Sequence, residues 1–229
     1  MMIEEEETRM SIQKKLNHLK LKFLAVPKTP KILTDKKHIA CIGDSITFGA
    51  GVHGKRKETW EYYLNEILGD AYQVINYGIS GRTLQDEGDF PYKADKFYQI
   101  SKDCKADIYV FMLGTNDAKP YNWNEDRYRI ELKRYIEEYT GLPQRPQLIL
   151  MTPPSCFPEE KTGIVAFDIL SENVEIAAQI VREEAENAGL KMIDMNDHTK
   201  THPEWSVDGV HPNAEGNRQF AKIIAEELK

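Results

Sequence analysis

Residues 39–47 read Ile39-Ala40-Cys41-Ile42-Gly43-Asp44-Ser45-Ile46-Thr47, an apolar run that ends in a polar turn. A short apolar run bounded by turn residues predicts a buried strand. Gly43 permits a sharp bend at the end of that strand. We therefore expect the side chain of Ser45, just past the bend, at the carboxyl edge of a parallel sheet, where open α/β folds form their ligand crevice.

Four further apolar runs follow this one, and longer helical patterns separate them. We expect strands near 38–42, 73–77, 107–113, 147–152 and 190–194. We expect helices near 58–68, 93–103, 125–139, 168–188 and 213–228. This alternation predicts an α/β fold, in which a five-stranded parallel sheet is covered by helices on both faces and the crossovers are right-handed.

Residues 1–35 differ in pattern from the rest of the chain. Ile12, Leu16 and Leu19 lie among lysines in a pattern typical of an amphipathic helix over residues 8 to 24, and Pro27 and Pro30 then interrupt it. We expect an N-terminal appendage over 1–35, a helix plus a linker, and one main domain over 36–229. The appendage is compatible with packing on the main domain, with dimerisation and with partial disorder, so a homo-oligomer stays open.

The composition disfavours several classes of protein. Apolar residues make up 41% of the chain, and no apolar run approaches the roughly 20 residues needed to span a bilayer. The net charge of −7 argues against nucleic acid and anionic membranes as partners. Three cysteines without metal-ligand spacing favour a reducing compartment. Glu4 to Glu7 have the wrong sign for a signal peptide, so we expect a cytoplasmic protein.

A polar motif follows each predicted strand, so all five motifs are expected at one edge of the sheet. They are Gly43-Asp44-Ser45, Asn76-Tyr77-Gly78-Ile79-Ser80-Gly81-Arg82-Thr83, Gly114-Thr115-Asn116-Asp117, Thr152-Pro153-Pro154-Ser155 and Asp208-Gly209-Val210-His211-Pro212-Asn213. Chance could place one or two such motifs there, whereas the full set indicates a single site.

The residue types in these motifs suit acyl transfer. A serine hydroxyl becomes a nucleophile when a base removes its proton, and the titration range of histidine suits that task. Ser45 and His211 could form this pair, with Asp208 holding the other ring nitrogen. A tetrahedral oxyanion would need donors, and the candidates are the backbone N–H groups of Ser45 and Gly81 and the side-chain amide of Asn116.

Four blocks in this order resemble the signature blocks of the SGNH (GDSL-type) hydrolases. They are Gly43-Asp44-Ser45, Ser80-Gly81, Gly114-Thr115-Asn116-Asp117 and Asp208-Gly209-Val210-His211, and the similarity extends over residues 36–229. The resemblance implies a flavodoxin-like three-layer α/β/α sandwich and a serine esterase with no metal or organic cofactor. Carried over by position, it implies that Ser45 is the nucleophile, with Gly81 and Asn116 as oxyanion donors. Asp208 and His211 would complete the triad.

The first block departs mildly from the family pattern. It continues with Ile46-Thr47 rather than the eponymous leucine, a variant that resembles acetyl-esterase and lysophospholipase-like branches. Substrate contacts are expected from side chains at the same edge of the sheet. These are Asp44, Arg82, Trp123, Phe157 and Trp205.

The substrate is less well defined than the chemistry. Aromatic side chains can stack on sugar faces or line a small acyl pocket, and no long apolar lid is visible between the motifs. We therefore expect a small acyl group, acetyl, on a carbohydrate or similar polar alcohol. Two alternatives stay open: a lysophospholipase or thioesterase that uses the same triad, and a non-catalytic flavodoxin-like binding module in which the motifs are only turns.

Two other patterns have simpler explanations. His198 and His202 are four residues apart, as in helical zinc sites, yet the threonines and the proline around them predict a loop with surface histidines. Asp86, Glu87 and Asp89 could suggest glycosidase carboxylates, but in a glycine-containing loop we expect them to be solvated.

Overall fold

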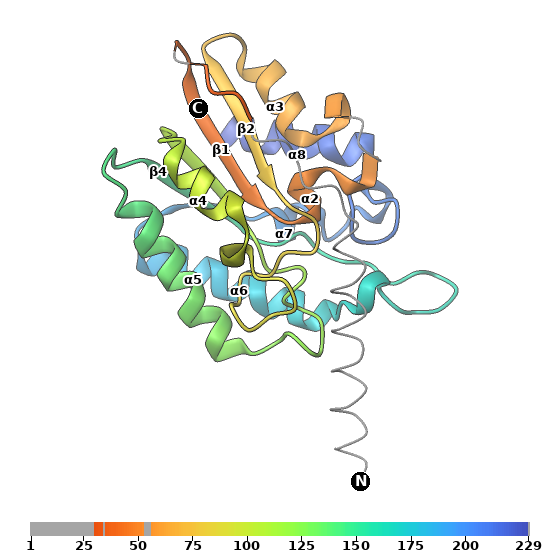
Figure 1. Ribbon diagram of the computed structural model, residues 1–229. Coiled ribbons are helices and arrows are strands. Elements are labelled where there is room, and N and C mark those ends of the chain that lie inside the picture. Colours follow the sequence, from red (N-terminus) through yellow and green to blue (C-terminus); the bar gives the residue numbers. More distant parts are fainter. Residues whose placement is uncertain (1–29, 34, 53–55, 229) are drawn as a thin grey trace.

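A computed structural model describes residues 30–33, 35–52 and 56–228 of the chain (Figure 1). The helix that we expect over residues 8 to 24 lies outside the described residues. Within them, five strands form one parallel sheet in the order β2-β1-β3-β4-β5. The strands are β1 (Lys37–Gly43), β2 (Tyr72–Gly78), β3 (Ile108–Met112), β4 (Gln147–Met151) and β5 (Lys191–Ile193). The predicted α/β fold with a five-stranded parallel sheet is confirmed.

Helices cover both faces of this sheet (Figure 1). One face carries α4 (Lys96–Asp103), α5 (Glu125–Thr140) and α6 (Ser171–Asn187). The other carries α3 (Trp60–Leu68), α7 (Met195–Thr199) and α8 (Ala214–Glu227). A further short helix, α2 (Ser45–Phe48), follows β1 directly. The structure is thus the three-layer arrangement that alternating strands and helices predict.

The buried parts of the strands are mostly apolar because both faces of the sheet are covered by helices. Successive side chains of a strand point to opposite faces, so each strand contributes to two cores. In β1, Ala40 and Ile42 join the core beneath α4, α5 and α6, whereas Ile39 and Cys41 join the core beneath α3 and α8. This packing fixes the face of the sheet to which each strand residue points, and with it the position of each strand in the sheet.

Segments far apart in sequence meet where α3 and α8 begin. The backbone N–H of Trp60 donates a hydrogen bond of 2.9 Å to Oδ1 of Asn217, and the two residues are 157 positions apart. The Trp60 ring is fully buried between the sheet and these helices. This contact ties the first residue of α3 to the first turn of α8.

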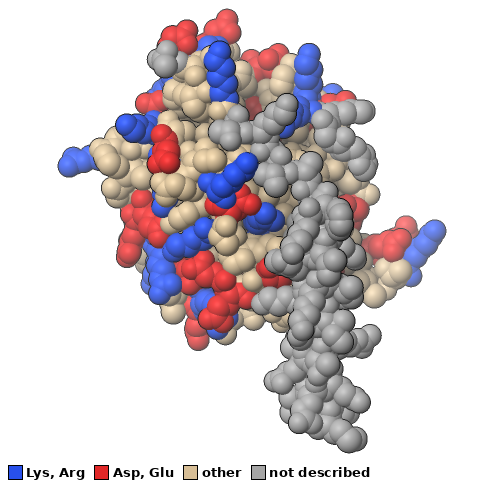
Figure 2. Space-filling view, viewed as in Figure 1, with Lys and Arg blue, Asp and Glu red and all other residues tan. Residues whose placement is uncertain are grey.

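The surface in Figure 2 has basic and acidic side chains interspersed over the visible face. None of the helices in the described ranges is both long and apolar enough to cross a membrane.

Candidate active site

Ser45 lies at the carboxyl end of β1, where the strand turns into α2. The turn begins at Gly43, where a Cβ atom would collide with the Thr47 hydroxyl and with the backbone of β3. Asp44 is the N-cap of α2, and its Oδ1 accepts a hydrogen bond of 2.9 Å from the N–H of Ile46. This turn holds Ser45 as the first residue of α2, with 8% of its surface exposed.

His211 reaches Ser45 from the loop that precedes α8. Its Nε2 lies 2.9 Å from the Oγ of Ser45, and its Nδ1 lies 2.7 Å from Oδ2 of Asp208. The Oδ1 of Asp208 accepts hydrogen bonds from the backbone N–H groups of Val210 and His211, at 3.0 and 2.8 Å. The structure therefore joins the three predicted side chains into one relay of hydroxyl, imidazole and carboxylate.

The carboxylate of Asp208 is stabilised in its ionised form. Burial would raise its pKa, but hydrogen bonds from the ring and the backbone of His211 outweigh burial and hold the pKa below its usual range. The ionised Oδ2 of Asp208 accepts a hydrogen bond from Nδ1–H of His211. This keeps the ring proton on Nδ1 and leaves Nε2 able to accept the proton of Ser45.

The loop that carries Asp208 is packed against a second segment at the same edge. Gly209 has φ +81°, and a Cβ there would collide with the carbonyl oxygen of Phe157. The N–H of Phe157 donates a hydrogen bond of 2.8 Å to the carbonyl of Gly209. Gly209 is required both for this backbone conformation and for the close approach, so it fixes the distance between the two loops.

The amide of Asn116 lies between the turns that follow β1 and β2. Its Nδ2 donates to Oδ2 of Asp44 at 3.4 Å and to the carbonyl oxygen of Arg82 at 3.3 Å. Gly81, next to Arg82, has φ +78°, a conformation that favours glycine. Asn116 is thus in contact with the neighbour of Ser45 and with the neighbour of Gly81, so the three predicted oxyanion donors come from adjacent turns.

Residues 41–219 match the model of the GDSL-like Lipase/Acylhydrolase family. The chain belongs to this family. The match confirms the resemblance to the GDSL-type hydrolases, and it includes all four of the blocks that indicate it, from the Ser45 turn to the His211 loop.

The proteins that are similar to this chain in sequence or in fold include several esterases. The chain is 32% identical to the acetylxylan esterase of Xylanibacter ruminicola, with 91% of this chain and 45% of that protein covered. It therefore spans about half the length of this curated relative. The solved aryl esterase of M. smegmatis has a TM-score of 0.67 at 22% identity, covering 84% of this chain and 98% of that one. A catalytic mutant of an acetylxylan esterase from Geobacillus stearothermophilus has a TM-score of 0.65 at 22% identity, covering 86% and 95%. The two solved structures share the fold.

Two buried carboxyl groups support the site of this GDSL-family chain. Burial raises the pKa of Asp44 to about 6, although hydrogen bonds and nearby cations partly compensate. Burial likewise raises the pKa of Asp117 to about 6. Asp117 accepts hydrogen bonds from the N–H groups of Leu84 and Gln85, at 2.9 and 2.8 Å. It therefore fixes the loop after β2, which carries Gly81.

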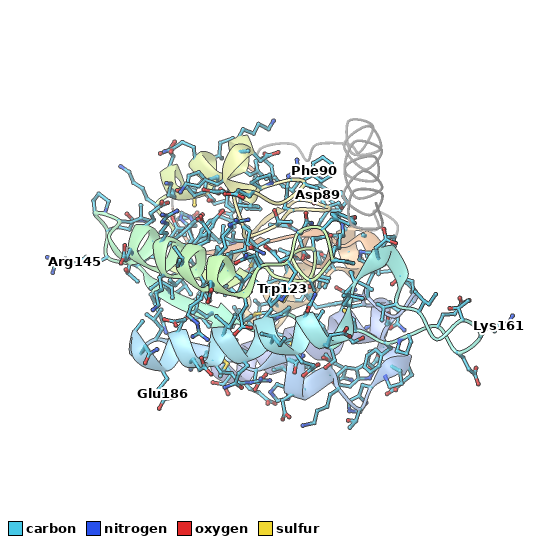
Figure 3. All side chains as sticks on the ribbon, turned by 90° about the horizontal axis from the view of Figure 1, so that it is seen from below. Asp89, Phe90, Trp123, Arg145, Lys161 and Glu186 are labelled. Atoms are coloured by element: carbon cyan, nitrogen blue, oxygen red, sulfur yellow. The ribbon has the colours of Figure 1, made fainter. Side chains whose placement is uncertain are left out.

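The prediction that Asp89 is solvated is wrong. Asp86 and Glu87 are exposed, but Asp89, which is labelled in Figure 3, is buried. Its Oδ1 accepts a hydrogen bond of 2.9 Å from Asn122, and its Oδ2 lies 3.8 Å from the ammonium nitrogen of Lys119. Both partners are about thirty positions away in sequence, so the composition of the loop alone does not reveal them.

Three of the predicted substrate contacts have side-chain partners within the described part of the chain. Arg82 forms an ion pair of 2.8 Å with Asp95, and Trp123 packs on Tyr128 with ring centroids 5.5 Å apart. Trp205 stacks face to face with a partly buried histidine, with 3.9 Å between the ring centroids. That histidine is His202, expected from the sequence to be at the surface. None of these ion-pair and ring contacts of the three side chains is with Ser45.

The sequence offers no signal for one aromatic residue that contacts the relay. The ring of Phe167 lies 5.1 Å from the ring of His211, with an angle of 74° between their planes. Phe167 belongs to the long connection between β4 and α6, outside every motif and every periodic pattern.

Proposed function

We propose that this chain is a serine esterase that hydrolyses a short-chain acyl ester, an acetyl ester, of a carbohydrate or similar polar alcohol. The observation that carries the proposal is the relay in which Ser45 contacts His211 and His211 contacts Asp208. The choice of acetyl is supported by the similarity to an acetylxylan esterase.

Attack begins when Nε2 of His211 takes the proton of Ser45. The Oγ then forms a bond to the ester carbonyl carbon, and the carboxylate of Asp208 stabilises the resulting imidazolium. The N–H groups of Ser45 and Gly81 and the amide of Asn116 donate to the tetrahedral oxyanion. The intermediate collapses by breaking the bond to the alcohol oxygen, which receives the proton from His211.

The acyl-enzyme is released by the same groups. His211, neutral again, removes a proton from a water molecule that attacks the acyl carbonyl. The second tetrahedral intermediate uses the same three donors. When it collapses, the bond to Oγ breaks, Ser45 recovers its proton from His211, and the carboxylic acid departs.

Replacing Asn116 by alanine is expected to lower kcat by about 100-fold, because one oxyanion donor is lost. Thermal unfolding should change little. Steady-state kinetics on an acetyl ester measure the effect. Asn124→Ala is the matched control, since Asn124 caps α5 and its Oδ1 accepts a hydrogen bond from the N–H of Arg127. Unchanged turnover in Asn116→Ala would remove this amide from the oxyanion hole.

The acyl group is tested with p-nitrophenyl esters of increasing chain length. We expect kcat/KM to be highest for the acetyl ester and to fall as the acyl chain grows. Because every member of the series has the same alcohol, only the acyl group varies. Strongest turnover on octanoyl or longer esters would instead favour the lysophospholipase or thioesterase alternative at the same triad.

A further inference from the structure

The connection between β4 and α6, residues 152–170, brings an aromatic ring to the proposed general base. This connection projects from the edge of the domain (Figure 1), and Lys161 lies at its outer end (Figure 3). Phe167 lies on its return path, with its ring 5.1 Å from that of His211. Phe167 is not buried, because 53% of its surface is exposed.

The backbone at Phe167 is strained. Phe167 has φ +64° and ψ +27°, and Asp168 has φ +60°, so two consecutive residues other than glycine are left-handed. A bulky side chain rarely adopts this conformation. Such strain persists where the surrounding structure enforces it, and it is concentrated at functional sites.

The chain on both sides of Phe167 is firmly held. Val165 and Ile169 are 7% and 3% exposed and belong to a small apolar cluster that also contains Val210, next to His211. The N–H of Leu170 donates a hydrogen bond of 3.2 Å to the carbonyl of Ala118. These anchors enforce the left-handed turn, and the turn directs the Phe167 ring to His211 while leaving half of the residue open to solvent.

The mechanism determines which part of a substrate this ring would meet. In the proposed reaction, His211 protonates the departing alcohol oxygen, so the alcohol portion of the ester lies beside the imidazole. The acyl portion lies at the oxyanion donors, on the side of Asn116. A ring that contacts His211 and is exposed beyond it is therefore placed to meet the alcohol, not the acyl group.

We propose that Phe167 forms the wall of an alcohol subsite that selects acetyl esters whose alcohol is a ring with a flat C–H face, such as a pyranose. This inference rests on the proposed function and deepens it. Aromatic rings pack well against such faces, whereas a short alkyl alcohol covers little of the ring. Phe167 is thus a specificity-determining residue for the alcohol, and its effect on selectivity belongs to acylation, because the alcohol has left before deacylation starts.

The test compares Phe167→Ala with the wild type on two acetyl esters, methyl β-xylopyranoside monoacetate and ethyl acetate. We expect kcat/KM to fall about 10-fold for the xyloside and less than 2-fold for ethyl acetate. Phe167→Tyr, which keeps the ring, should retain wild-type selectivity. Ile164→Ala is the matched control, because Ile164 is an exposed apolar residue of the same connection.

A second variant separates this role from folding. Phe167→Gly removes the ring and relieves the left-handed strain, so its thermal stability should equal or exceed that of the wild type while its selectivity is lost. The inference would be overturned if the wild type hydrolyses both esters and Phe167→Ala loses kcat/KM equally on both, or loses none on the xyloside. If the wild type hydrolyses neither ester, or Ser45→Ala keeps full activity, the proposed function fails first and the inference falls with it.

Discussion

Replacing Ser45 by alanine is expected to lower kcat for an acetyl ester by about 10⁶-fold, since loss of the nucleophile disables the whole triad. In the proposed mechanism the acyl-enzyme forms on the Oγ of Ser45. Among the described residues, Ser45 carries the hydroxyl that is hydrogen-bonded to Nε2 of His211. The remaining rate enhancement, about 10³-fold over water, would come from the oxyanion donors and from substrate binding.

The measurement combines turnover with covalent labelling. A fluorophosphonate probe should label the wild type stoichiometrically and should leave Ser45→Ala unlabelled. Ser155→Ala is the matched control, because Ser155 follows β4 at the same edge and is likewise 8% exposed. Its hydroxyl donates to the carbonyl of Asn196 at 3.1 Å, away from the relay. Failure to label the folded wild type would favour the non-catalytic binding module, and labelling of folded Ser45→Ala would place the nucleophile at another residue.

Replacing Asp208 by asparagine is expected to lower kcat by about 10⁴-fold with little loss of stability. An asparagine oxygen can still accept from the N–H groups of Val210 and His211, so the turn survives. The asparagine NH₂ would face Nδ1 of His211 and donate to it. The ring proton would then move to Nε2, and the imidazole could no longer accept the proton of Ser45.

The structure contains a natural control for this effect. Nδ1 of His202 lies 2.8 Å from Oε1 of Glu204, a second carboxylate–imidazole pair that does not contact Ser45. Glu204→Gln should therefore leave kcat unchanged. Nitrogen NMR of His211 should show the proton on Nδ1 in the wild type and on Nε2 in Asp208→Asn. If Asp208→Asn kept full activity and its His211 still carried the proton on Nδ1, the proposed role of Asp208 would be refuted.

Much of this architecture can be predicted from sequence because its signals are local. All five strands are found where apolar runs predict them, since a strand buried on both faces has few polar residues to obscure it. The Ser45 turn could also be predicted, because it directly follows β1. Asp208 and His211 are separated from β5 by α7, so the block before the last helix and its resemblance to the family pattern indicate them. The short helix α2 escapes prediction, since four residues are too few to show a helical period.

The remaining features depend on contacts that no local pattern encodes. Asp89 is buried because Lys119 and Asn122 come to it from another loop. Phe167 contacts His211 because its backbone is left-handed, and nothing in the residues around it indicates that conformation. Trp123 and Trp205 each pack against another ring, that of Tyr128 and that of His202, and these partners could not be read from the residues around them.

The wide separation of the relay residues has a consequence for biosynthesis. Ser45 and His211 are 166 positions apart, and His211 lies in the loop that precedes α8, the last helix of the chain. A ribosome must therefore translate 166 residues beyond the nucleophile before a base can reach it. If the proposed mechanism holds, a growing polypeptide whose His211 loop is still inside the exit tunnel lacks its general base and should not cleave esters.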